Sequence, residues 1–224
     1  MPHPLPELTL VETRVLGVLF EKQHTVPDTY PLTLNALVSG CNQKSSRSPV
    51  IEASDAQVQE ALDRLKSLSL VIESSGSRVA RYEHNLERVL HVPQQSAALL
   101  TALMLRGPQT AGELRIACDR LHRFSDISSV EAFLAELAAR TEGALVLELP
   151  RQPGARENRW AHLLSGTPAV ESAPVQREAV GGAAGQVAEL EARIARLEAG
   201  MAEQHALIAQ LCAQLGIAPP AGGA

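Results

Sequence analysis

The stretch SDAQVQEALDRLKSLSLVIESSGSRVARYEH, residues 54–84, decides the fold. Ser54 or Asp55 can cap a helix, and apolar residues then recur at the spacing of one helical face: Val58, Ala61, Leu62, Leu65 and Leu68. Residues 70–74 and 78–84 are predicted to form two β-strands around a Ser-Gly-Ser turn. A helix followed directly by a small hairpin is typical of the last part of a winged helix-turn-helix.

Two further helices are predicted upstream of this stretch. Thr9 and Glu12 have the spacing of a capping box, and an apolar stripe follows at Val15, Leu16, Leu19 and Phe20. A shorter helix is predicted at residues 32–39, and a polar loop at residues 41–50 leads to the third helix. The order helix, helix, helix, strand, wing, strand is therefore complete.

The same order recurs between residues 92 and 166. Helices are predicted to begin near residues 96, 110 and 128, and strands at residues 144–149 and 159–164 enclose a hairpin that contains Pro and Gly. We therefore predict a mainly α protein with small β-hairpin wings, in the α+β sense: two tandem winged-helix domains plus a C-terminal coiled-coil helix.

Composition and charge divide the chain further. We predict a first winged-helix domain at residues 1–91, a second at 92–166, a flexible linker at 167–185, a coiled-coil helix at 186–216 and a disordered tail at 217–224. Of the formal charge of −5, the first domain carries −2, the second is neutral, and the remainder carries −3. The acidic excess of the chain therefore lies entirely outside the second domain.

Several short motifs resemble the YceH-like family of bacterial proteins. In chain order they are CNQKSSRSPV at 41–50, VARY with the nearby His84, LRGPQT followed by GELR at 105–115, and LPRQPG at 149–154. The resemblance covers about residues 8–164 and implies a tandem winged-helix architecture of unassigned biochemical activity. Within the loop, Ser46 and Ser48 stand where the family more usually has Asn and Asp.

Large apolar residues near the C-terminus alternate at three- and four-residue spacing. Branched residues at the first heptad position and Leu at the fourth favour a parallel two-stranded coiled coil. The alternative is that the helix folds back onto its own chain, although a seam of two positions in seven is narrow for a globular face. We expect self-association into a homodimer through Val187, Leu190, Ile194, Leu197, Met201, Ile208 and Leu211.

Composition also limits the class of protein. With 45% hydrophobic and 20% charged residues, the chain resembles folded globular proteins rather than disordered ones. No apolar run approaches the ~20 residues that span a bilayer, and the first residues, MPHPLP, lack the pattern of an export signal. The three cysteines form no Cys-x-x-Cys pair. We expect a cytoplasmic protein that does not enter a membrane.

Signatures of catalysis are absent from the sequence. It contains no glycine-rich phosphate loop, no Gly-x-Ser-x-Gly and no His-Glu-x-x-His motif. Cys118 and His122 lie four residues apart on a predicted helix, a spacing that suits two metal ligands but more often reflects a packed cysteine. We therefore expect neither an enzyme nor a bound metal or cofactor.

Basic and amide side chains of the first domain are the candidates for contacts with double-stranded DNA. They lie in the polar loop, at the start of the third helix and on the wing: Lys44, Arg47, Gln43, Gln57, Arg78 and Arg81. Their four cations predict a salt slope of about −3.6 per chain and about −7 for a dimer. The alternative is that the loop only caps helices and Arg81 forms an ion pair. The second wing adds Arg151, Arg156 and Arg159.

Two functional hypotheses remain open at this stage. The first, which the winged-helix fold favours and which we expect, is a dimeric DNA-binding or regulatory factor that uses loop 41–50, the third helix and the wing of the first domain. The second is a tandem winged-helix module that binds a protein partner without direct DNA contact. Both third helices carry acidic residues, which repel phosphates and favour the second hypothesis: Asp55, Glu60 and Asp63 in one, Asp126, Glu131 and Glu136 in the other.

Overall fold

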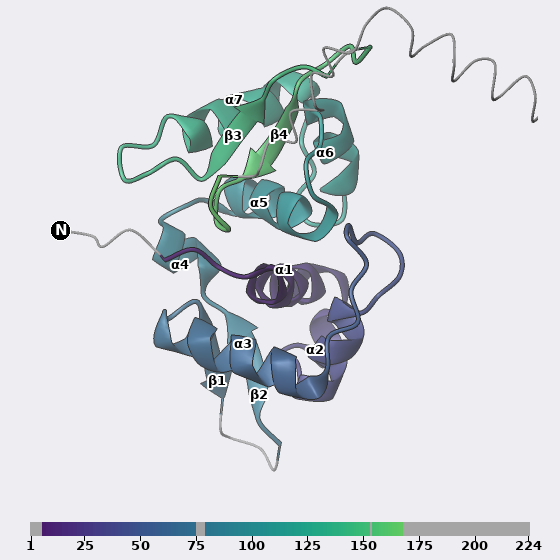
Figure 1. Ribbon diagram of the computed structural model, residues 1–224, viewed down its shortest axis with the longest axis vertical. Coiled ribbons are helices and arrows are strands. Elements are labelled where there is room, and N and C mark those ends of the chain that lie inside the picture. Colours follow the sequence, from purple (N-terminus) through teal and green to yellow (C-terminus); the bar gives the residue numbers. More distant parts are fainter. Residues whose placement is uncertain (1–5, 75–78, 153, 168–224) are drawn as a thin grey trace, which may run out of the picture. The chain divides into compact units, whose positions relative to one another are not determined.

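The computed structural model describes residues 6–74, 79–152 and 154–167 (Figure 1). The expected turn of the first wing and Arg78 lie outside these residues. So do all but the first residue of the predicted linker, the whole predicted coiled coil with its seven association residues, and the predicted tail. These parts of the sequence analysis remain predictions.

The first unit contains three helices and a two-stranded antiparallel hairpin. Its elements are α1 (Leu10–Thr25), a 3-10 turn η1 (Pro27–Thr29), α2 (Leu34–Cys41), α3 (Asp55–Ser67), β1 (Val71–Ser74) and β2 (Arg81–His84). A short helix that the sequence analysis did not predict, α4 (Leu86–Leu90), follows the hairpin. It leads directly into the second unit.

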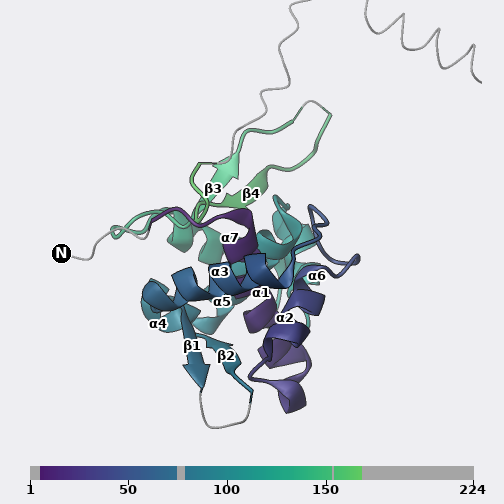
Figure 2. The same cartoon turned by 60° about the horizontal axis from the view of Figure 1, so that its bottom comes forward.

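The second unit repeats this order. Its elements are α5 (Gln94–Arg106), α6 (Ala111–Ala117), α7 (Ile127–Ala138), β3 (Val146–Leu149) and β4 (Arg159–His162). β3 and β4 pair antiparallel, as β1 and β2 do, and each hairpin can be followed in Figure 2. The mainly helical fold with two small hairpin wings is therefore confirmed.

Side-chain caps explain where the helices begin. The predicted capping boxes at Thr9 and Thr110 are present at α1 and α6, and Ser54 caps α3. The cap of α7 is Asp126, whose carboxylate accepts a hydrogen bond from the backbone N–H of Ser129 at 2.7 Å. This helix thus begins at Ile127, one residue before the predicted start near residue 128.

A matching backbone bridge in each unit supports the internal repeat. The residue two positions before α2, Leu32, exchanges two backbone hydrogen bonds with Tyr82 of β2. Gln109, two positions before α6, exchanges the same pair of bonds with Trp160 of β4. Each hairpin therefore gains a third, one-residue strand from the same place in its unit, as expected if one plan is used twice.

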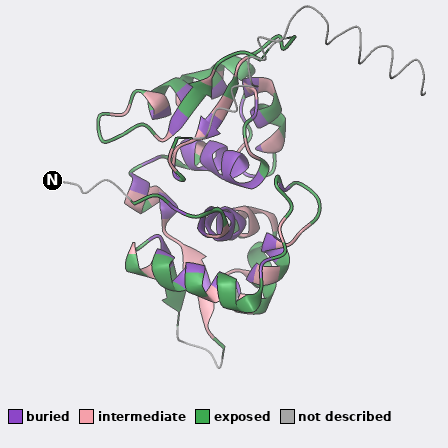
Figure 3. Cartoon of the chain, viewed as in Figure 1, coloured by how far each residue is buried: buried purple, intermediate pink, exposed green. Residues whose placement is uncertain are grey.

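The two units share one core, in which α1 packs against α5. Most residues of both helices are buried, as the purple ribbons of Figure 3 show. The helices approach closely at Gly17, where a Cβ atom would lie only 2.9 Å from Leu105 Cδ2. All the described residues belong to one compact body. The two winged units are therefore joined by a buried helix pair and not only by the chain.

Candidate functional site

Loop 41–50, the predicted DNA-binding loop, is held at both ends. The side chain of Asn42 donates to the carbonyl oxygen of Ala53 at 2.8 Å and accepts from its backbone N–H at 2.7 Å. Further along, the backbone N–H of Ser48 donates to the carbonyl oxygen of Leu105, at the end of α5, at 2.9 Å. The loop thus connects the first unit to the second.

Arg47 anchors this loop from within. Its side chain has no exposed surface, and its two terminal nitrogens bind the two carboxylate oxygens of Glu21 on α1 at 3.1 and 2.6 Å. Its Nε atom also donates to the carbonyl oxygen of Gly40. Burial alone would raise the pKa of Glu21, but the hydrogen bonds and charge of Arg47 hold it below its ordinary value. The guanidinium of Arg47 therefore points into the protein and is not exposed to a DNA phosphate.

A second buried arginine supports the same loop. Arg14, on α1, is fully buried and donates to the carbonyl oxygens of Cys41 and Pro49 at 3.1 and 2.6 Å. Burial and the neighbouring charge of Arg47 lower the pKa of its guanidinium. The sequence analysis missed Arg14, although one signal was available: it is a charged residue within the apolar run of the first helix.

The other predicted DNA contacts are also largely engaged within the chain. Gln57 completes the capping box of α3, and Arg81 donates to the carbonyl oxygens of Pro31 and Thr29 rather than to a carboxylate. Gln43 accepts hydrogen bonds from Lys22 and Arg47. Lys44 is exposed. The structure thus brings Gln43 and Arg47 together, inside the loop, and the five of these residues that it describes form no shared surface; Arg78 lies outside the described residues.

The cations of α3 are paired as well. Lys66 lies 2.9 Å from Asp63 and 2.7 Å from Glu73, and hydrogen bonds to these carboxylates raise the pKa of its ammonium group. Arg64 lies 3.3 Å from Glu12 on α1. The exposed residues of α3 thus include three acidic side chains, Asp55, Glu60 and Asp63, and both cations of the helix already bind carboxylates.

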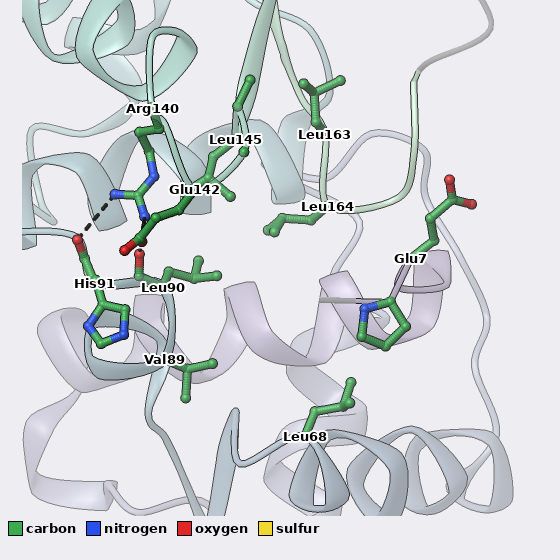
Figure 4. Close-up of a pocket in the computed structure, with 13 residues that line it drawn as sticks. Glu7, Leu68, Val89, Leu90, His91, Arg140, Glu142, Leu145, Leu163 and Leu164 are labelled. Carbon is green, nitrogen blue, oxygen red and sulfur yellow. Dashed lines mark hydrogen bonds and ion pairs between the residues drawn. The ribbon is translucent and has the colours of Figure 1, made fainter. Parts of the chain in front are cut away.

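A hollow of about 370 Å³ lies between the two units (Figure 4). Its walls come from the end of α3, from α4, from the residues on either side of the second hairpin and from the N-terminal segment. The apolar residues of this wall are Leu68, Val89, Leu90, Leu145, Leu163 and Leu164, with Pro6 and Ala144 beside them. We call this the inter-unit hollow. The inter-unit hollow is a concave, partly apolar surface, whereas loop 41–50 is polar.

Hydrogen bonds and an ion pair at one rim of the inter-unit hollow join the second unit to α4. Arg140, which follows α7, donates to the carbonyl oxygens of Leu90 and His91 at 2.8 and 3.2 Å and pairs with Glu142 at 2.9 Å. At another edge, the backbone N–H of Leu8 donates to the carbonyl oxygen of Leu164 at 2.8 Å. These bonds fix the second unit to α4 and to the N-terminal segment.

The structure shows no metal centre among its described residues, where no cluster of three or more His, Cys, Asp and Glu side chains occurs. Cys118 is buried, its thiol donates to the carbonyl oxygen of Ala98, and burial raises its pKa to about 12. The ring of His122 packs edge-on against Phe124 instead. A thiol in this setting behaves as a small apolar side chain.

Comparison with known proteins identifies the family. The family described as "Protein of unknown function, DUF480" matches residues 8–155. The chain belongs to this family. It is 62% identical over 208 residues to a UPF0502 protein of Dechloromonas aromatica, covering 93% of this chain and 97% of the relative. A UPF0502 protein of Paraburkholderia phymatum is 56% identical, with 96% and 93% covered. The resemblance to the YceH-like family is thereby confirmed. None of the helices in the part of the chain that the structure describes has the length and hydropathy of a membrane span.

Proposed function

We propose that this protein is a non-enzymatic interaction module that holds a segment of a protein partner between its two winged-helix units. The observation that carries this proposal is the inter-unit hollow, whose wall includes five leucines and one valine. Apolar surface that remains open in a folded chain favours contact with another apolar surface, because burial removes it from water.

The size of the hollow limits what can enter it. At about 370 Å³ it lies at the lower end of the range of ligand sites, about 300–1,000 Å³. It accommodates a few apolar side chains, whereas a whole helix has a diameter of about 10 Å. The partner therefore presents a short segment with one or two apolar anchor residues.

The hypothesis of a dimeric factor that binds DNA through the first unit has less support. Four of the six side chains expected to contact DNA, Gln43, Arg47, Gln57 and Arg81, already bind groups within the chain. The exposed face of α3 is also acidic, which would place negative charge against phosphates. A partner with apolar anchors does not meet this repulsion.

Site-specific photo-crosslinking in the bacterial cell tests the proposal. We would place a benzophenone amino acid at Leu163, which lines the hollow, and in a matched control at Ile72 on β1, a 42% exposed apolar residue outside the hollow's lining. We expect a covalent complex with another protein from position 163 only, identified by mass spectrometry.

A second change sharpens this experiment. Leu145→Asp places a charge in the wall of the inter-unit hollow and is expected to abolish the crosslink from position 163. Equal products from both positions, or a product that persists in this variant although its melting temperature is unchanged, would refute the proposal. Adducts that contain only two copies of this chain would also refute it.

A further inference from the structure

Ionisable side chains lie beside the apolar wall of the inter-unit hollow: Glu7, His91, Arg140 and Glu142. Arg140 and Glu142 form an ion pair at 2.9 Å, so their charges offset each other. The carboxylate of Glu7 has no ion pair or hydrogen bond with the described residues. With His91 neutral, the lining therefore keeps one net negative charge, and that charge is on Glu7.

Glu7 is held in place although its side chain is exposed. Its carbonyl oxygen accepts a hydrogen bond from Arg64 of α3 at 3.0 Å. The backbone N–H of the next residue, Leu8, donates to the carbonyl oxygen of Leu164 at 2.8 Å. The backbone at Glu7 is thus fixed to the third helix of the first unit and to the segment after the second hairpin.

Gly166 leaves room for the carboxylate of Glu7. A Cβ atom at residue 166 would lie only 2.6 Å from Oε1 of Glu7, and the φ angle of 80° at this residue also favours glycine. The carboxylate therefore lies against the backbone of the second unit. Figure 4 shows Glu7 on the side of Leu164, with the Arg140–Glu142 pair on the other side of the hollow.

The cations near this surface are already engaged. Arg64 lies 3.3 Å from the carboxylate of Glu12 and binds only the backbone of Glu7. Arg140 donates to the carbonyl oxygens of Leu90 and His91 and pairs with Glu142. An acidic group that enters the hollow would therefore have to displace a partner of Arg140 and would be repelled by Glu7, whereas a basic group would find a carboxylate without a partner.

We propose that the partner segment carries a lysine or arginine next to its apolar anchor residues, and that this cation pairs with Glu7. The inference rests on the proposed function, because it concerns the segment that the inter-unit hollow holds. The apolar wall contributes burial of the anchor side chains, and Glu7 selects among apolar segments by their charge.

Selection of random heptapeptides displayed on phage, with the full chain immobilised, tests this proposal. We expect the selected peptides to be enriched in leucine, isoleucine or valine next to lysine or arginine, relative to the unselected library. With Glu7→Gln the apolar enrichment should remain and the basic enrichment should disappear. The matched control is Glu52→Gln, which removes the same charge from an exposed residue outside the hollow's lining and should select the same peptides as the unmodified chain.

A synthetic peptide from the selection then measures the ion pair directly. Replacing its basic residue by glutamine should weaken binding to the unmodified chain by about two- to fivefold, the effect of an exposed ion pair, and should leave binding to Glu7→Gln unchanged.

The outcomes separate this inference from the proposed function. Equal basic enrichment on the unmodified chain and on Glu7→Gln, enrichment of acidic residues, or the same loss of peptide affinity in both proteins would overturn the inference alone. If no apolar residues are enriched, or if their enrichment persists with Leu145→Asp, the hollow does not hold an apolar segment. The proposed function would then be wrong, and the inference with it.

Discussion

Removing the carboxylate of Glu21 should destabilise the protein strongly. In Glu21→Gln the guanidinium of Arg47 remains buried without its counter-charge. Loss of one partner of a buried ion pair costs about 3–5 kcal/mol, and we expect about 3 kcal/mol here because Glu21 keeps 16% of its side chain exposed. At about 2–4 °C per kcal/mol for a chain of this size, the melting temperature falls by about 6–12 °C.

Urea unfolding followed by far-ultraviolet circular dichroism measures this effect directly, with Lys44→Gln as the control from the exposed part of the same loop. Replacing both partners, as Glu21→Met with Arg47→Met, should recover most of the loss, because apolar residues of similar volume do not leave an unpaired charge. If Glu21→Gln lowers the free energy of unfolding by less than about 1 kcal/mol, the ion pair does not stabilise the buried guanidinium of Arg47. The interpretation of the loop as a structural connection would then be wrong.

Three further predictions address other parts of the chain. Gly40→Ala should lower the free energy of unfolding in urea by about 1–3 kcal/mol, because the new Cβ would lie 2.6 Å from Val18 Cγ1. Gly112→Ala has no atom nearer than 3.9 Å to its new Cβ and should stabilise the protein. Equal effects of the two substitutions would contradict the packing argument. Burial and the charge of His24 lower the pKa of His84 to about 4, below the ~6.5 of the unfolded chain, so stability should fall as the pH drops from about 6.5 to 4, by up to roughly 3 kcal/mol. His84→Gln should reduce the loss of stability between pH 6.5 and 4. The same dependence of stability on pH in this variant and in the unmodified chain would contradict the assignment to His84. Light scattering of the full chain and of a version ending at residue 185 should give dimeric and monomeric masses; the same mass for both would exclude association through residues 186–216.

Local signals in the sequence account for most of the fold. Capping boxes at Thr9 and Thr110 and apolar stripes along the helices act over three or four residues, so they can be recognised without knowledge of tertiary contacts. Helix α4 was missed because it has only five residues and Asn85 provides no side-chain cap. Its place is set by packing of Leu86 and Leu90 in the core.

The candidate sites depend on contacts between distant parts of the chain, which explains why they were harder to predict. Lys44 and Arg47 lie in one polar loop and carry the same charge, yet one is exposed and the other buried. The difference comes from Glu21, which is 26 positions away in the sequence. The inter-unit hollow likewise combines Leu68, Leu90 and Leu145 from separate elements, and no single motif contains it.

The buried pairing of α1 with α5 has a consequence for how this protein can be taken apart. A fragment that ends at residue 91 would lose α5 and expose the face of α1 around Gly17, and its counterpart would expose ten consecutive residues of α5, Ser96 to Leu105, that are all buried in the whole chain. Neither half is therefore a soluble reagent for two-hybrid or pull-down work. The surfaces of the two repeats can therefore change independently, whereas the buried faces of α1 and α5 require both repeats in one chain.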